Sequence, residues 1–380
     1  MKAAIAAGAT GGHVFPAVAV GQELCRLRPD TRLLFVGREA GSERDRLGTN
    51  GSDYLGLRVR GLGPRPRWKS VLAMWETLAA EEKCHANFRR EKPDVVLGFG
   101  GYVAAPVMLA AQRLRIPTAL HEANVVPGKV NRWLAPYIDQ VFLSFGEAER
   151  SFRCRRLEVV GMPVRREAIG KSADHRCFGL QPGVFTILIF AGSQGARSLC
   201  RAGAEAIEIL EERGLEFQVL FQTGHSNEAE TRAGIERDNV SVVPFIEEMG
   251  KAYACADLVV ARAGAGSIAE VAHNARPAIL VPYPHAAGHQ ERNARILCQA
   301  GAARMILDGD LDGRALAQEI GSLIRDPRSR SEMAEAVARF AHPRAAQRIA
   351  EGLIRLADRS STEGPKDRAS TRKSNGKTRA

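Results

Sequence analysis

The sequence predicts an α/β protein made of two Rossmann-like halves, each with a parallel β-sheet, that face a central cleft. Three observations indicate this. The chain has 380 residues, which is long for a single hydrophobic core. Short apolar runs alternate with longer helical patterns, as is typical of parallel α/β sheets. The order of these parts also occurs twice along the chain.

The repeat is visible in two pairs of segments. An opening strand and glycine turn in residues 3–24 have a counterpart in residues 186–210. Further on, an Asp-led strand enters a glycine loop, a helix of small residues follows, and a proline precedes the next strand. This layout runs from Asp94 to Pro117 and again from Asp257 to Pro277. Ligands of open α/β sheets bind beyond the carboxyl ends of the strands, so we expect the site in a cleft between the halves.

These parts divide the chain into four regions. We expect a first domain at residues 1–162, a second at 163–340, a helix at 341–357 that packs across the joint, and a basic tail at 358–380. The tail lacks large apolar residues and is predicted to be disordered.

Charge and composition narrow the range of functions. The formal net charge is +11, and the tail from Arg359 onward holds seven Lys or Arg residues against two acidic ones. A second basic cluster suits an anionic lipid surface or a polyanionic substrate, with a solvated surface as the alternative. Its members are Arg58, Arg60, Arg65, Arg67 and Lys69. Nucleic acid is not expected as a partner, because aromatic residues make up only 6% of the chain and no recognition module occurs.

Cysteine usage and hydropathy indicate a cytoplasmic protein. The seven cysteines are scattered singly, which favours reduced thiols over disulfides or a zinc site. No stretch approaches the roughly 18 apolar residues of a membrane helix, and the N-terminal residues do not match a signal peptide.

The first candidate site is the turn Gly8–Pro16, which follows a strand and opens a helix. Its backbone N–H groups are expected to point into the cleft, although plain strand-to-helix geometry is the alternative. His13 favours a functional role, because a helix N-terminus disfavours imidazolium and leaves a neutral ring that accepts a proton. A general base for a sugar hydroxyl needs that state.

A second glycine turn, Gly98–Tyr102, opens the helix of small residues in the first half. Together with the first turn it lines a surface that suits a pyrophosphate, with tight packing as the alternative. The following strand ends in polar residues at the same edge of the sheet. These residues are His121, Glu122 and Asn124.

A third turn, Ala191–Arg197, lies in the second half. Ser193 and the neighbouring amides form an anion nest beside a helix N-terminus, or Ser193 is simply the helix N-cap.

A fourth turn, Arg262–Glu270, allows two interpretations. Ser267 and Glu270 fit the S-x-x-E capping box, in which the glutamate bonds the backbone at the helix start. The other interpretation has Glu270 accepting both ribose hydroxyls of a nucleotide whose phosphates lie on Gly264 to Ser267. The spacing does not separate the two.

Two amides open another helix near the end of the second half. Gln290 and Asn293 lie three residues apart, on one helix face, and a neutral amide pair suits the hydroxyls of a sugar. We find no pair of carboxylates spaced as in a glycosidase and no metal-binding cluster, so no cofactor and no obligatory metal are expected.

The chain resembles the MurG family of N-acetylglucosaminyltransferases, of glycosyltransferase family 28, over roughly residues 1–355. Eight motifs occur in the family's order and at about its spacings, namely GATGGHVFPAVAV, GFGGYVAAP, HEANVVPG, GMPVR, AGSQGAR, PFIEEM, RAGAGSIAE and PHAAGHQERNA. The resemblance implies a GT-B fold, with a lipid-linked acceptor on the N-terminal half and UDP-GlcNAc on the C-terminal half. It implies inverting transfer of GlcNAc to the C4 hydroxyl of MurNAc in lipid I, undecaprenyl-pyrophosphoryl-MurNAc-pentapeptide, which gives lipid II for peptidoglycan.

The resemblance also implies roles for single residues, with His13 as the candidate catalytic base. The implied UDP-GlcNAc contacts are Thr10, Gly11, Gly12, Asn124, Arg165, Ser193, Ile246, Ala265, Gly266, Ser267, Glu270, Gln290 and Asn293. Among them, Arg165 and Ser193 hold the diphosphate, Ile246 the uracil through its backbone, and Glu270 the ribose. The implied acceptor contacts are Gly100, Gly101, Tyr102, His121 and Glu122. The chain departs from the family pattern at Ala9, Ala123 and Met162, which replace a glycine, a glutamine and an asparagine.

The implied location is the cytoplasmic face of the bacterial inner membrane, without a membrane span. The expected partners are UDP-GlcNAc, lipid I, the anionic inner-leaflet surface, and other proteins of cell-wall synthesis or division. An apolar stripe at helical spacing is the candidate membrane contact, and a place in the core is the alternative. Its members are Val71, Leu72, Met74, Trp75 and Leu78.

Three rival functions remain at this point. A related transferase acts on diacylglycerol or another lipid; the HEAN segment and the GATGGH turn favour lipid I instead. A non-catalytic UDP-sugar-binding subunit would lack the base or an intact donor loop, and both are present. A UDP-sugar epimerase would need additional carboxylates in the cleft.

Overall fold

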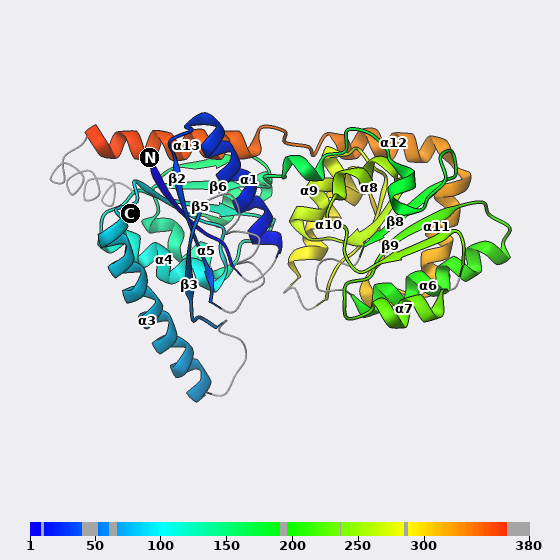
Figure 1. The fold of residues 1–380 in the computed structure, drawn as a ribbon, viewed down its shortest axis with the longest axis horizontal. Helices are drawn as coiled ribbons and strands as arrows, with labels where there is room; N and C mark the ends of the chain where they lie inside the picture. Colours follow the sequence, from blue (N-terminus) through cyan, green and yellow to red (C-terminus); the bar gives the residue numbers. More distant parts are fainter. Residues whose placement is uncertain are drawn as a thin grey trace. The chain divides into compact units, whose positions relative to one another are not determined.

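The computed structural model describes residues 1–8, 11–39, 52–60, 67–190, 196–235, 237–284 and 288–362, with side chains except in 67–71 and 360–362. The chain forms two compact units (Figure 1). Unit 1 comprises Met1–Ala123, Pro127–Val160 and the chain from Arg344, and unit 2 comprises Asn124–Val126 and Gly161–Pro343. Each unit contains one parallel sheet, which confirms the prediction of two Rossmann-like halves.

The sheet of unit 1 has the strand order β3-β2-β1-β4-β5-β6-β7 in the described residues, and every neighbouring pair is parallel. The strands are β1 (Lys2–Ala6), β2 (Arg32–Arg38), β3 (Asp53–Leu57), β4 (Val95–Gly98), β5 (Thr118–Glu122), β6 (Gln140–Leu143) and β7 (Leu157–Val159). The order reverses between β1 and β4, and this switch point is where doubly wound sheets bind ligands.

Helices cover both faces of this sheet. The core on one face is filled from α1 and α13, and the core on the other from α3 and α4. The helices are α1 (Gly11–Leu27), α3 (Arg67–Glu91), α4 (Gly101–Arg113), α5 (Lys129–Leu134) and α13 (Ala345–Thr362), with 3-10 turns η1 (Ala135–Tyr137) and η2 (Gly146–Ser151).

The sheet of unit 2 repeats the topology, with the order β10-β9-β8-β11-β12-β13 in the described residues. Its strands are β8 (Thr186–Phe190), β9 (Gln218–Gln222), β10 (Val240–Val243), β11 (Leu258–Arg262), β12 (Ala278–Val281) and β13 (Arg304–Met305). The order reverses between β8 and β11. The opening strands of the two repeated segments, β1 and β8, therefore occupy equivalent positions in their sheets.

In unit 2, α6 and α11 pack on one face of the sheet, and α8, α9 and α10 lie on the other side (Figure 1). The helices are α6 (Arg197–Glu212), α7 (Glu228–Gly234), α8 (Met249–Cys255), α9 (Ala265–His273), α10 (His289–Gln299), α11 (Gly313–Arg325) and α12 (Pro327–Ala338). The 3-10 turns are η3 (Arg166–Ala168), η4 (His175–Phe178) and η5 (Asp308–Asp310).

The aspartates that lead strands have a shared structural reason. Asp94 accepts a hydrogen bond from the backbone N–H of Lys2 at 2.7 Å, and Asp257 accepts one from Thr186 at 2.8 Å. Each carboxylate therefore satisfies the first donor of the neighbouring opening strand, β1 or β8. The repeated Asp is thus a feature of the fold rather than of the site.

The last helix, α13, belongs to unit 1. Its residues Ile349 and Leu353 are fully buried in the core beside α1, and Arg348 bonds Glu158 at 2.8 Å. The helix ends at Thr362, five residues beyond the predicted end at 357. Residues 363–380 of the predicted tail lie outside the described residues.

Candidate functional site

The predicted base lies at the start of α1, next to the switch point of unit 1. His13 is partly buried, and its Nδ1 is 2.9 Å from the carbonyl oxygen of Gly8. A carbonyl oxygen only accepts, so Nδ1 carries the hydrogen, and in the neutral form of the ring Nε2 is the proton acceptor. Gly11 and Gly12 precede His13 in the first turn of α1, whereas Thr10 lies outside the described residues.

The second glycine turn packs directly against the first. A Cβ atom added at Gly8 would overlap Val103 of α4, and one added at Gly101 would lie 3.6 Å from Cε1 of His13. Gly100 and Gly101 both have positive φ, 87° and 72°. Tyr102 is partly buried and packs against the core of unit 1. Tight packing therefore accounts for part of this turn, and it also brings α4 beside the base.

Two predicted acceptor contacts prove to be buried. His121 is fully buried, with Nε2 3.3 Å from the Ser144 hydroxyl, and Glu122 is 3% exposed. The Glu122 carboxylate accepts hydrogen bonds from the backbone of Gly128 at 3.0 Å and from the amide of Asn131 at 2.8 Å. The prediction of direct acceptor contact is corrected here: these side chains anchor the loop after β5, because burial leaves them no access to an acceptor.

Asn293 also has a different place from the one predicted. It is fully buried, its Oδ1 accepts the N–H of Val125 at 3.1 Å, and its Nδ2 donates to Oδ1 of Asn124 at 3.1 Å. Both ends of the amide are engaged within unit 2. Asn293 therefore holds the segment Asn124–Val126 instead of offering its amide to a sugar, while Asn124 remains partly exposed.

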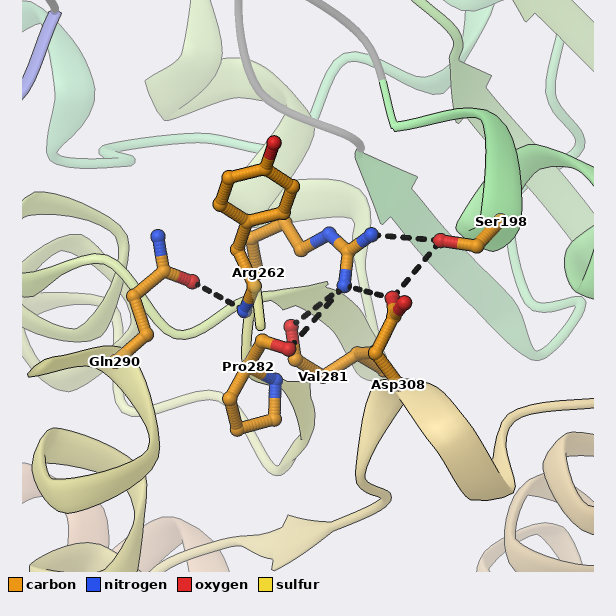
Figure 2. A network of polar contacts seen from close by, with 7 residues as sticks. Ser198, Arg262, Val281, Pro282, Gln290 and Asp308 are labelled. Atoms are coloured by element: carbon orange, nitrogen blue, oxygen red, sulfur yellow. Dashed lines mark hydrogen bonds and ion pairs between the residues drawn. The ribbon is translucent and has the colours of Figure 1, made fainter. Parts of the chain in front are cut away.

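Gln290 is partly exposed, and one end of its amide bonds the backbone of its own loop. Its Oε1 accepts the backbone N–H of Tyr283 at 2.9 Å, and Figure 2 shows its amide nitrogen turned away from this bond. The carbonyl end fixes the side chain to its own loop, and the nitrogen at the other end of the amide is a hydrogen-bond donor.

A buried arginine joins the elements beside this loop. Nη1 of Arg262, at the end of β11, contacts Asp308 at 2.5 Å and the carbonyl oxygens of Val281 and Pro282 at 3.3 and 3.4 Å (Figure 2). Nη2 donates to the Ser198 hydroxyl of α6 at 2.7 Å, and the guanidinium lies 5.6 Å from the centre of the Tyr283 ring. This network ties the ends of β11 and β12 to the start of α6.

The structure of the fourth turn decides between the two interpretations of Ser267 and Glu270. The N-cap of α9 is Gly264, which makes no side-chain cap bond, and Glu270 is the sixth helical residue. Glu270 therefore stands beyond the first turn, and the capping box is wrong. Its Oε2 instead accepts the hydroxyl of Tyr253 at 3.2 Å. Burial raises the pKa of Glu270 to about 7, against the charge of Arg165 and the Tyr253 bond, which lower it.

The start of α9 is open. A Cβ atom added at Gly266 would meet no atom within 4 Å, and one added at Gly264 would meet only the Ser267 hydroxyl, at 3.9 Å. Ala265, the first residue of α9, is buried, while Gly266 and Ser267 are partly exposed. Free N–H groups at a helix start beside unfilled space suit an anion such as a diphosphate.

Arg165 and Ile246 lie on neighbouring segments of unit 2. Arg165 precedes η3, and Asn274 of α9 holds this segment by bonds to Gly170 at 2.7 Å and Ala168 at 2.9 Å. The N–H of Ile246 donates to Oε1 of Gln222 at 3.1 Å. Ser193 lies outside the described residues.

Several residues of this region were missed by the sequence reasoning, namely Ser198, Tyr253, Arg262, Asn274 and Asp308. One signal was available: Arg262 ends a strand that is otherwise apolar and buried, and a buried charge needs partners. Within the described ranges, no group of three or more His, Cys, Asp or Glu side chains is arranged to hold a metal ion.

The apolar stripe lies on α3 and is not core. We define the α3 apolar patch as Leu72, Met74, Trp75 and Leu78, whose exposed fractions run from 44% to 65%. The face of α3 that packs inward carries Ala73, Ala80, Cys84 and Phe88. The side chain of Val71 lies outside the described residues. In the part of the chain that the structure covers, no helix is long and apolar enough to cross a membrane.

Two parallel sheets that share one order over six strands, with glycine turns at both switch points, are typical of the GT-B class of nucleotide-sugar enzymes. The chain belongs to glycosyltransferase family 28. The Glycosyltransferase family 28 N-terminal domain matches residues 3–143, and the Glycosyltransferase family 28 C-terminal domain matches residues 186–349.

Relatives support the same placement over nearly the full length. A protein of Chlorobium limicola is 38% identical over 94% of this chain and 100% of its own, and one of an Anaeromyxobacter species is 39% identical over 94% of each. Both are named UDP-N-acetylglucosamine--N-acetylmuramyl-(pentapeptide) pyrophosphoryl-undecaprenol N-acetylglucosamine transferase. The crystal structure of Acinetobacter baumannii MurG superposes with a TM-score of 0.74 at 29% identity, covering 93% of this chain and 99% of that one.

Proposed function

We propose that the chain transfers GlcNAc from UDP-GlcNAc to the C4 hydroxyl of MurNAc in lipid I and so makes lipid II for peptidoglycan. The observation that carries the proposal is identity of 38–39% over 94% of the chain to transferases named for this reaction. Their names also favour a transferase over an epimerase or a binding subunit.

The proposed reaction is a single displacement with inversion. Nε2 of His13 takes the proton of the acceptor hydroxyl, and the oxygen forms a bond to the anomeric carbon of GlcNAc as the bond to UDP breaks. The hydrogen bond from Nδ1 to the Gly8 carbonyl supports this role, because it fixes the tautomer that a base needs. Gly11, Gly12, Gly100 and Gly101 would offer backbone groups to the acceptor pyrophosphate.

The donor would lie on unit 2. In this proposal the diphosphate meets the open start of α9, Arg165 and Ser193, which stabilise the charge that develops on UDP. The ribose would bind Glu270, the uracil the backbone of Ile246, and the GlcNAc Gln290 and Asn124. The unfilled space at Gly266 and the directed amide of Gln290 support this arrangement.

We further propose that the reaction needs no obligatory metal, because Arg165 and helix N–H groups meet the leaving-group charge. Turnover should persist in excess EDTA. Loss of activity in EDTA, restored by a divalent cation, would contradict this part of the proposal.

We also propose that the protein contacts the anionic inner-leaflet surface through the α3 apolar patch, since a polyprenyl tail keeps the acceptor in the bilayer. Figure 1 shows the N-terminal half of α3 projecting beyond the sheet of unit 1. Arg58 and Arg60 precede it, although Arg58 pairs with Glu39 and Arg60 pairs with Glu76 at 3.2 Å. An exposed tryptophan beside basic residues suits an interfacial helix whose binding weakens with salt.

The membrane proposal is tested by co-sedimentation with anionic vesicles at low and high salt. A Met74→Ser, Trp75→Ser double variant should fold normally and bind much less. Trp133→Ser, which changes an exposed tryptophan outside the patch, is the matched control and should bind as the wild type does. Equal binding by the double variant would place the contact elsewhere.

The function itself is tested by turnover of labelled UDP-GlcNAc against two sets of acceptors, MurNAc prenyl diphosphates and diacylglycerols. Product is expected only with the first set. Comparable transfer to diacylglycerol would favour the related lipid transferase, and UDP-GlcNAc binding without turnover would favour the binding subunit.

A further inference from the structure

A buried tyrosine contacts the predicted ribose ligand. Tyr253 of α8 is fully buried, and its ring meets Phe190 edge-on with centres 6.0 Å apart. Its hydroxyl donates to Oε2 of Glu270 on α9 at 3.2 Å. A phenylalanine would fill the same apolar volume, so the hydroxyl matters for the one bond that it makes to the carboxylate.

The direction of this bond is fixed by chemistry. Burial and the neighbouring Glu270 raise the pKa of Tyr253 well above its ordinary value, so the phenol keeps its proton and acts as the donor. The carboxylate must accept. Its Oε2 is therefore held from the protein side, while the residue as a whole is partly exposed.

The surrounding elements hold this pair rigidly. A Cβ atom added at Gly250 of α8 would lie 2.6 Å from the Glu167 carbonyl of η3, so α8 and η3 are in close contact. Asn274, at the end of α9, bonds the backbone of Ala168 on the same turn. Three elements thus bring Tyr253, Glu270 and Arg165 together.

We propose that Tyr253 is a positioning residue for nucleotide binding: its hydroxyl keeps the Glu270 carboxylate ionised and oriented toward the ribose diol of a uridine nucleotide. The inference rests on the proposed function, because it takes Glu270 as the ribose ligand. It adds a residue that the donor itself does not touch, and it makes donor capture depend on pH near neutrality.

The sign of this dependence follows from the groups that face the carboxyl. Burial raises the pKa of Glu270 to about 7, and Arg165 and Tyr253 oppose that rise. Two further titratable groups lie on α9 and α8: the His273 ring bonds the Ala269 carbonyl, and Lys251 pairs with Glu248. The contribution of the ribose contact to nucleotide affinity is therefore full above this pKa and is lost as pH falls through it. Removing the Tyr253 hydroxyl raises the pKa further and moves the loss to higher pH.

The test compares Tyr253→Phe with wild type by calorimetric titration of UDP and 2′-deoxy-UDP between pH 6 and 9. The ratio of the two affinities isolates the contact of the 2′-hydroxyl, because titration of the phosphate affects both ligands equally. In the variant, the Kd of UDP at pH 7 should rise roughly three- to tenfold, with a smaller rise for 2′-deoxy-UDP, which keeps the 3′-hydroxyl, and the midpoint of the ratio should move to higher pH by up to about one unit. The kcat at saturating donor should be unchanged.

Two further variants make the result specific. Glu270→Gln should abolish the pH dependence of the ratio, and adding Tyr253→Phe to it should have no further effect on UDP binding. Tyr54→Phe removes a hydroxyl that bonds the Arg38 carbonyl in unit 1, and it should leave the midpoint in place.

A Tyr253→Phe protein that is less stable but has an unmoved midpoint and an unchanged ratio would show a purely structural tyrosine and overturn the inference. That outcome leaves the proposed donor site standing, because UDP would still bind. Failure of the wild type to bind UDP at any pH would overturn the proposed donor site, and the inference with it.

Discussion

Two strand-to-helix turns, one in each unit, share a sequence layout but use their glycines differently. In unit 1 the turn from β4 to α4 has Gly100 at φ 87° and ψ −165°, a conformation open essentially to glycine alone. A Cβ atom there would lie 2.8 Å from the amide of Asn131. In unit 2 the turn from β11 to α9 has Gly264 at an ordinary φ of −65°, and a Cβ atom at Gly266 would touch nothing.

The comparison separates two reasons for a glycine. In the first turn the backbone and its neighbours require it, so the structure alone explains it. In the second turn neither conformation nor packing requires it, and the space that it leaves suits a ligand. Unit 1 therefore carries a filled turn that requires glycine beside His13, the proposed base, and unit 2 an open turn at the start of the helix that carries Glu270, the proposed ribose ligand.

The largest expected effect tests whether unit 1 supplies the catalytic base while unit 2 binds the donor. His13→Ala removes the proton acceptor of unit 1 and should lower kcat by roughly 10²- to 10⁴-fold, while the Kd of UDP-GlcNAc stays unchanged. Steady-state kinetics and donor titration give the two numbers. A higher Kd of UDP-GlcNAc with an unchanged kcat would show that His13 does not take part in the chemical step.

The next effect tests the strained turn. Gly100→Ala forces a side chain into a glycine-only conformation against Asn131, which is itself bonded to Glu122. The free energy of unfolding should fall by about 1–3 kcal/mol, measured by chemical denaturation. An unchanged free energy of unfolding would show that the turn relaxes and that the glycine is not required.

Gly266→Ala is the counterpart in the open turn. The free energy of unfolding should stay the same or rise by up to about 1 kcal/mol, because alanine is the better helix former. The KM for UDP-GlcNAc should rise about tenfold, roughly 1.4 kcal/mol, since the methyl group takes the space of the diphosphate. A destabilised protein with a normal KM would show that the fold, and not the ligand, requires Gly266.

The smallest effect concerns the sugar. Gln290→Glu keeps the oxygen that accepts the Tyr283 N–H but removes the amide donor. Losing one hydrogen bond to a sugar hydroxyl should cost about 0.5–1.5 kcal/mol in UDP-GlcNAc affinity, with a smaller effect on UDP. Equal losses for both ligands, measured by competition binding, would argue against a sugar contact.

Several features of the fold were predictable because they are local. The alternation of apolar runs and helical patterns, the glycine turns and the repeated Asp-led strand occur within short segments, and the two units repeat them with one strand order. The positions of the base and of the turns at the switch points follow directly from that order.

The division of tasks among the polar residues was not predictable in the same way. His121, Glu122 and Asn293 have the residue types of ligands, yet they are at most 3% exposed and bond the protein itself. Conversely, Leu72, Met74, Trp75 and Leu78 have the spacing of a core stripe, yet they are exposed. Periodicity defines a helix face but not what that face meets.

By itself, then, the sequence determined the order of elements and where strands turn into helices, because hydrophobic period and glycine act over a few residues. Only the tertiary structure decided which side chains are buried and which partners they find. Tyr253 meets Glu270 from 17 residues away, and Arg262 meets Asp308 from 46. Burial and charge pairing depend on segments that the chain brings together only on folding, and these contacts set the ionisation of Glu270 and hold the amide of Asn293.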